Sequence, residues 1–130
     1  MPETRAIRIT AGAVTMEAVL NGSATATRIW EALPIDAVGR TWGDEIYFEI
    51  PIKAALDKDA QAVVELGALG YWPPGSAFCI FFGPTPASRN SDEIRPYSPV
   101  NVVGQVRGDS RAFKAVRSGT TIRLEAVPRA

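Results

Sequence analysis

Two stretches of the chain decide its fold: WGDEIYF, residues 42–48, and YWPPGSAFCIFFGPTP, residues 71–86. Together they hold two of the three tryptophans and two of the three tyrosines. In the first stretch the apolar Ile46 and Phe48 alternate with Glu45 and Tyr47, which is the period of a strand with one buried face. Glycines let the backbone bend, and prolines fix sharp corners. Both stretches therefore predict strands that bend around a compact β core.

The remaining sequence adds further strands and one helix. Residues 5–10 and 14–20 alternate in polarity around Gly12, which predicts a hairpin. Apolar residues from 26 to 33 recur at helical spacing after residues 21–23, which offer helix-capping oxygens, and Pro34 ends the pattern. The other expected segments are a strand at 77–82 covered on both faces, an irregular excursion at 84–99, and strands at 100–106 and 120–127. Six to eight strands with one clear helix predict a mainly β barrel or sandwich.

The composition excludes several classes of protein. Fourteen basic and fourteen acidic side chains leave no net charge, and there is no basic cluster of the kind that binds nucleic acid. Histidine is absent, and the single cysteine is Cys79. We therefore expect no metal site, no cofactor, no intramolecular disulfide and no histidine-activated nucleophile. Because Cys79 lies in an apolar strand, we interpret it as a buried thiol of the core.

Length and hydropathy predict one domain that spans residues 1–130. The longest strongly apolar run covers only residues 78–82, far below the roughly 20 residues that a membrane-spanning helix needs. Residues 1–5 lack the long apolar stretch of a signal peptide. We expect a cytoplasmic location and no membrane contact. The sequence does not predict the oligomeric state.

Five blocks, in this order, resemble the small prokaryotic cyclophilin-like domains of unknown function. The blocks lie within residues 25–34, 42–48, 70–75, 81–86 and 100–104. The resemblance implies a closed eight-stranded cyclophilin-like β-barrel with one or two short helices. It implies no settled activity.

The resemblance does not carry over prolyl-isomerase chemistry. Cyclophilin enzymes place an arginine in a Phe-His-Arg context, followed by a Phe-Met-x-Gln-Gly-Gly segment, and this sequence contains neither. Arg40 lies on roughly the matching strand without that motif, so it is a weak catalytic candidate. We favour a solvated arginine at a strand end.

The candidate ligand-binding residues gather where aromatic rings and prolines meet at the expected rim of the barrel. They are Trp42, Glu45, Tyr47, Tyr71, Trp72, Phe81, Phe82 and Thr85. Aromatic walls are typical of ligand sites, although each ring could equally belong to the core. Glu45 and Glu49 should face outward about 13 Å apart, at about 3.3 Å per residue, which is too far for a paired acid–base or metal site. We therefore favour solvated carboxylates.

Three functions are compatible with these residues. The first is a non-catalytic binding module for a small metabolite or short peptide at the aromatic, proline-rich rim. The second is a weak peptidyl-prolyl isomerase without the usual motif, which rests on fold resemblance alone. The third is a structural or oligomerisation domain that uses exposed strand edges or the corner at residues 71–75.

Overall fold

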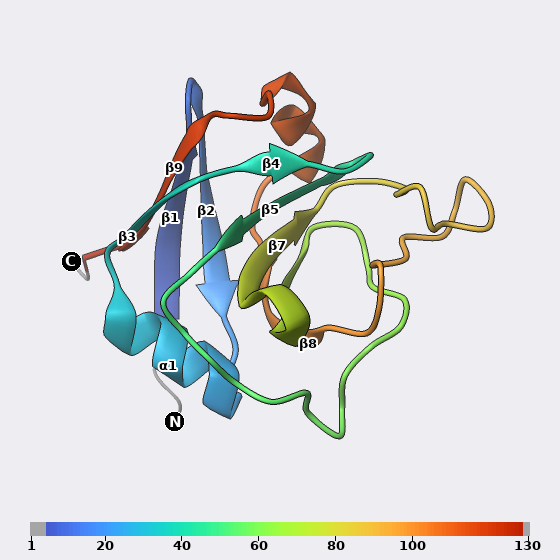
Figure 1. The fold of residues 1–130 in the computed structure, drawn as a ribbon. Helices are drawn as coiled ribbons and strands as arrows, with labels where there is room; N and C mark the ends of the chain where they lie inside the picture. The colour runs from blue at the N-terminus through green and yellow to red at the C-terminus, as the bar shows by residue number, and fades with distance from the viewer. Residues whose placement is uncertain (1–4, 129–130) are drawn as a thin grey trace.

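The computed structural model describes residues 5–128 and contains a single nine-stranded antiparallel sheet within them (Figure 1). The strands are β1 (Arg5–Ala11), β2 (Val14–Leu20), β3 (Ile35–Val38), β4 (Arg40–Thr41), β5 (Glu45–Glu49), β6 (Ala68–Trp72), β7 (Ala77–Phe81), β8 (Asn101–Val106) and β9 (Thr121–Ala126). The helical elements are α1 (Ala24–Ala32) and the short 3₁₀ segments η1 (Pro73–Gly75) and η2 (Ser110–Ala115). The mainly β prediction is confirmed.

The sheet closes on itself through one sharply bent segment of chain. Its strand order is β3-β9-β1-β2-β8-β6-β7-β5-β4, so the two outermost strands, β3 and β4, are neighbours along the chain. Only Gly39 separates them, and a Cβ atom at Gly39 would lie 2.6 Å from Ile122 Cδ1. A side chain at position 39 would therefore force the fully buried Ile122 to shift. The bend at Gly39 divides residues 35–41 into β3 and β4, which is why the barrel has nine strands rather than the expected eight.

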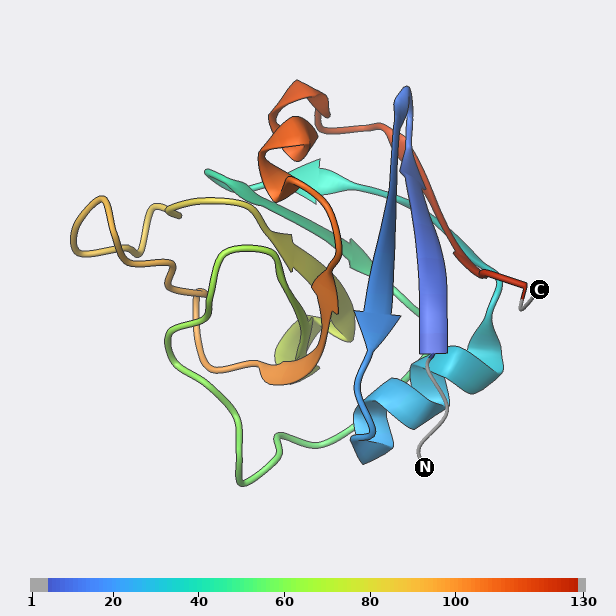
Figure 2. The same cartoon turned by 180° about the vertical axis from the view of Figure 1, so that it is seen from behind.

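The two ends of the barrel are covered by the helical elements (Figures 1 and 2). The hairpin of β1 and β2 forms as expected, with Arg5 paired to Leu20 and Ala11 to Val14. Ser23 then caps α1 by accepting a hydrogen bond from the Ala26 amide, at 3.2 Å. Apolar residues of α1 and of η2 are fully buried in the core of the barrel: Ala26, Ile29 and Phe113.

Strand β7 separates two apolar cores because it is covered on both faces, as the sequence predicts. Phe78 and Ile80 point into the barrel, whereas Ala77, Cys79 and Phe81 belong to a second cluster on its outer face. Val64, Ile94 and Val100 come from long connections to complete this outer cluster. The outer surface of the barrel is therefore shielded from water at this cluster.

The outer cluster is covered by an irregular connection between β7 and β8, which projects from the side of the barrel (Figure 2). Isolated bridges pair Val64 with Ile94 and Gln61 with Val100. These bridges fix both ends of the segment 94–100 against the molecule, and they thereby determine where Tyr97 lies. No helix among residues 5–128 is long and apolar enough to cross a membrane.

Candidate functional site

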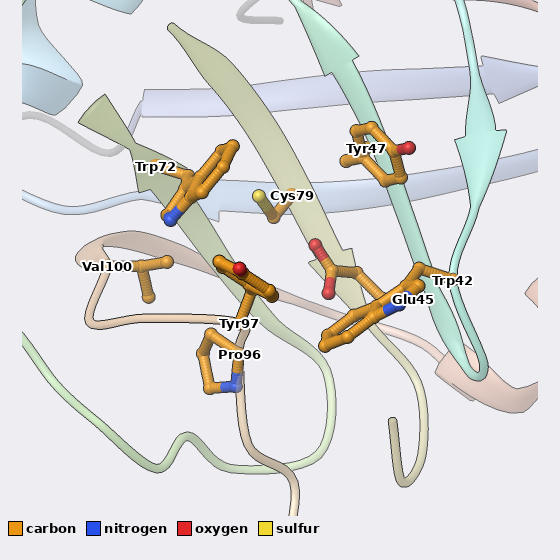
Figure 3. A pocket seen from close by; sticks show the side chains of 8 residues that line it. All are labelled: Trp42, Glu45, Tyr47, Trp72, Cys79, Pro96, Tyr97 and Val100. Carbon is orange, nitrogen blue, oxygen red and sulfur yellow. The ribbon is translucent and has the colours of Figure 1, made fainter. Parts of the chain in front are cut away.

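A pocket of about 180 Å³ opens on the outer face of the barrel, between strands β5, β6 and β7 and the segment 94–100 (Figure 3). Its walls are mainly aromatic, with one carboxylate and one thiol among them. The lining residues are Trp42, Glu45, Tyr47, Trp72, Cys79, Pro96, Tyr97 and Val100. Strand alternation explains the arrangement, because Glu45 and Tyr47 of β5 and Cys79 of β7 all occupy outward-facing positions.

The turn between β4 and β5 holds Trp42 beside Glu45. The Trp42 amide donates a hydrogen bond to the Glu45 carbonyl, at 2.9 Å. Gly43, within the turn, has a φ of +59°, a left-handed conformation that favours glycine. A Cβ atom there would also come within 3.0 Å of the Thr85 backbone. Gly43 therefore allows both the tight turn and its close packing against the neighbouring connection.

Tyr97 lies between the two tryptophans of the pocket. Its ring centroid is 6.0 Å from that of Trp42 and 5.9 Å from that of Trp72, with both pairs in edge-to-face geometry. The Trp72 indole nitrogen donates a hydrogen bond to Ser98 Oγ at 2.6 Å, which ties the ring to the segment that carries Tyr97. Tyr97 is itself 75% exposed. The three rings thus form one side of a pocket that stays open to solvent.

Glu45 is the unusual group of the pocket. The expectation of a solvated carboxylate is wrong, because only 6% of Glu45 is exposed, and its Oε1 has no hydrogen-bond partner among the described residues. Burial raises the pKa of Glu45 to about 7, although the neighbouring Cys79 thiol opposes part of this change. Glu49, on the same face of β5, is exposed as expected.

Cys79 lies next to this carboxylate at the base of the pocket (Figure 3). It is 2% exposed, which agrees with the buried thiol that the sequence predicts. Burial and the neighbouring Glu45 charge both raise the pKa of the Cys79 thiol well above its usual value. A thiol held in its neutral form is a poor nucleophile. The pair therefore offers a carboxylate and a neutral thiol to a ligand, and no activated sulfur.

The structure brings four of the eight ligand-binding candidates together at the pocket: Trp42, Glu45, Tyr47 and Trp72. Two of the other four contribute rings to the inside of the barrel, Tyr71 and Phe82. Phe81 lies on the outer face but is fully buried. Thr85 is 6% exposed and its hydroxyl bonds to the Arg95 carbonyl, so it holds the irregular connection together.

Arg40, the catalytic candidate, lies outside this pocket. It is exposed on the two-residue strand β4 and lines a neighbouring hollow of about 450 Å³ that shares Tyr47 and Trp72 with the pocket. Asp36 and Glu49 also line that hollow. Arg40 therefore lies beside the aromatic walls without facing the buried carboxylate. Within residues 5–128, no three residues of the types His, Cys, Asp or Glu are grouped so as to hold a metal ion.

Sequence analysis did not identify four residues of the lining, namely Cys79, Pro96, Tyr97 and Val100, as part of a site. Tyr97 carried a signal that could have found it, since it is an aromatic residue between two prolines in an otherwise polar connection. Cys79 and Val100 carried no such signal, because a buried apolar residue on a strand gives the same sequence pattern whether or not a pocket lies above it.

Comparisons with known proteins agree with this architecture. A family model described as cyclophilin-like matches residues 5–125. The solution structure of a hypothetical protein from Archaeoglobus fulgidus is similar over 95% of each chain, with 38% sequence identity and a TM-score of 0.80. A search of curated proteins gives no match. The chain therefore belongs to the cyclophilin-like family, as the five sequence blocks indicated.

Proposed function

We propose that this cyclophilin-like protein is a binding module that takes up a small metabolite, or one side chain of a short peptide, in the pocket beneath Tyr97. A single observation carries this proposal: a buried carboxylate, Glu45, lines the pocket, and its Oε1 has no hydrogen-bond partner within residues 5–128. Leaving a buried acceptor unsatisfied costs about 1–3 kcal/mol, and more if it is charged. A ligand that supplies a hydrogen-bond donor or a positive counter-charge would offset this cost.

The size of the pocket limits what it can enclose. Its volume of about 180 Å³ is below the range of about 300–1,000 Å³ that holds drug-sized ligands. A single headgroup or side chain fits this volume better than a whole peptide or a dinucleotide. The surrounding surface, including the hollow beside Arg40, would then contact whatever extends from that group.

A screen that does not assume the ligand's chemistry tests the proposal. In ¹⁵N-labelled protein, the indole signals of Trp42 and Trp72 report on the pocket, whereas Trp30, on α1 and outside the pocket, serves as an internal control. The panel would contain amines, carboxylic acids, neutral metabolites and Xaa-Pro peptides. We expect at least one class to shift Trp42 and Trp72 while Trp30 stays unchanged. If no compound does so at millimolar concentration, the binding module is excluded.

A weak peptidyl-prolyl isomerase is the second candidate, because Arg40 lies in a hollow that adjoins the pocket and shares two of its rings. Exchange spectroscopy on the Xaa-Pro peptides of the same panel would detect it. Exchange faster than the uncatalysed tens to hundreds of seconds, and lost in Arg40→Ala, would identify an isomerase. Exchange at the background rate would exclude the isomerase.

A further inference from the structure

The fixed charge on the described lining of the pocket is negative. Glu45 is the only charged residue among the described residues of its lining. Two nearby basic side chains are engaged elsewhere: Arg95 pairs with Glu93 at 2.9 Å, and Lys114 lies 3.8 Å from Asp44. Arg40 is exposed in the adjoining hollow and does not line the pocket. An anionic ligand would meet an uncompensated carboxylate, and a neutral ligand would leave the ionised carboxylate without a counter-charge. Charge complementarity therefore favours a cation.

The rings around the carboxylate favour the same sign of charge. Four of the eight lining residues are aromatic, and two of these are tryptophans, whose faces attract cations most strongly. Attraction extends to about 6 Å from the ring centroid. The centroids of Trp42 and Trp72 lie 6.0 and 5.9 Å from that of Tyr97, so the three rings pack against one another as a continuous aromatic wall.

We infer that the pocket binds a methylated or quaternary ammonium group, with the Glu45 carboxylate as its counter-ion and Trp42, Trp72 and Tyr97 as its walls. This ligand class rests on the binding role proposed above. The group can belong to a free small molecule or to a methylated lysine side chain of a peptide. Both present the same headgroup.

The shortage of hydrogen-bond acceptors distinguishes methylated ammonium from other cations. A primary ammonium has three donors and a guanidinium has five, each of which needs an acceptor when buried. Besides the Glu45 carboxylate, the oxygen acceptors among the lining side chains are the hydroxyls of Tyr47 and Tyr97, and Tyr97 is 75% exposed. The Trp72 indole N–H is a donor and already bonds to Ser98. The Tyr47 hydroxyl points away from the carboxylate (Figure 3). A methylated ammonium has few or no donors to satisfy and presents methyl groups to the rings.

The protonation of Glu45 makes the expected binding dependent on pH. The other titratable residues in the lining are Tyr47, Cys79 and Tyr97, and burial keeps Cys79 neutral by raising its pKa. Asp44, beside Glu45 in the turn, is near Lys114. With a Glu45 pKa of about 7, a cation binds the ionised form and releases the proton. Affinity should therefore fall about tenfold from pH 8 to pH 6.

The test compares a cation with its neutral isostere. Choline and 3,3-dimethylbutanol have nearly the same shape but differ in charge, and the indole signals of Trp42 and Trp72 measure the binding of each at pH 8. We expect choline and tetramethylammonium to bind at least about tenfold more tightly than the alcohol. A peptide that contains trimethyllysine, measured beside its unmethylated form, identifies the source: tighter binding than choline assigns a peptide, and weaker binding a free compound.

Variants complete the test. Glu45→Gln should weaken choline binding about tenfold or more, while Glu31→Gln, which removes an exposed carboxylate from α1 and lies outside both the pocket and the hollow, should leave it unchanged. Tyr97→Leu keeps an apolar side chain at an exposed position and should weaken binding by about 2- to 5-fold through loss of the ring. Equal affinity for choline and the neutral alcohol, or full binding by Glu45→Gln, would overturn the inference. A binder of another class from the wider panel would still leave the binding module in place.

Discussion

Asn101 of β8 and Glu45 of β5 are both buried polar side chains on the same barrel, 1% and 6% exposed respectively, but their hydrogen bonding differs. Asn101 accepts a hydrogen bond from the Asp57 amide at 2.8 Å and donates to Thr25 Oγ1 at 3.2 Å and to the Ala55 carbonyl at 3.0 Å. Glu45 keeps one carboxylate oxygen without any partner among the described residues.

The difference separates a structural role from a functional one. The hydrogen bonds of Asn101 hold the long connection between β5 and β6 against the barrel. Tyr71 does the same from inside, since its hydroxyl donates to the Ile52 carbonyl at 2.6 Å and accepts from the Ala54 amide at 3.1 Å. Buried polar groups are normally satisfied in this way. A fold that satisfies these two residues and leaves Glu45 open has a site that a ligand can complete.

The largest expected effect is a change of stability with pH, which involves Glu45 and not Asn101. The folded state raises the pKa of Glu45 from 4.5 to about 7, so it binds more protons than the unfolded state between these values, and stability falls as pH rises through that window. The lost stabilisation is up to about 3 kcal/mol, at about 1.4 kcal/mol per pH unit. Glu45→Gln should abolish it, so that the variant gains up to about 3 kcal/mol on the native protein between pH 4.5 and pH 8.

Denaturant unfolding at several pH values measures this effect. Glu49→Gln is the matched control, because Glu49 is exposed on the same strand. A Glu45→Gln variant whose free energy of unfolding runs parallel to that of the native protein from pH 4.5 to pH 8 would show that Glu45 titrates normally.

Removal of the Asn101 side chain should destabilise the protein at every pH. Asn101→Ala leaves the Asp57 amide and the Ala55 carbonyl without their partners, which we expect to cost about 2–3 kcal/mol. Urea unfolding at pH 5 and pH 8 should give the same loss. A loss that varies with pH as that of Glu45 does would mean that the two sites are coupled, and the proposed distinction would fail.

Tyr71→Phe should have a smaller effect, about 1–2 kcal/mol, because the ring still fills the barrel and only the hydroxyl is lost. Its free energy of unfolding should fall while ligand binding at the pocket, followed by the Trp72 indole signal, stays within twofold of the native value. Loss of binding in Tyr71→Phe would place this residue in the functional site rather than in the core.

Ser98→Ala should have the smallest effect on stability, below about 1 kcal/mol, since Ser98 is only partly buried. The variant removes the acceptor of the Trp72 indole, so the segment that carries Tyr97 should loosen. Faster hydrogen exchange of the Trp72 indole N–H, with that of Trp30 unchanged, would show this. An unchanged Trp72 rate would mean that Ser98 does not hold the ring in place.

Local patterns in the sequence predicted most of the fold. Alternation placed Ile46 and Phe48 inside the barrel, and the capping segment 21–23 marked the start of α1, where Ser23 is the cap. The ninth strand was missed because Gly39, at the break between β3 and β4, packs closely against Ile122, which is far away in the sequence. Long-range contacts of this kind have no local signature.

The candidate site was only partly predictable. Trp42 and Trp72 stood out as large aromatic residues beside glycine or proline, and alternation placed Glu45 on the outer face. Burial of Glu45 depends on the segment 94–100, which folds back over β5 and β7 and carries Tyr97 with it. The residue pattern within 42–48 gives no information about the segment 94–100, so a solvated carboxylate was the natural expectation.

The most direct test of a cation site at Glu45 is an NMR titration of its side-chain carboxyl group, with and without tetramethylammonium. The account predicts a pKa near 7 in the free protein. It also predicts that tetramethylammonium lowers this pKa, whereas 3,3-dimethylbutanol at the same concentration does not. A pKa near 4.5 in the free protein would contradict the account, because the carboxylate would then be solvated and would need no ligand to complete it.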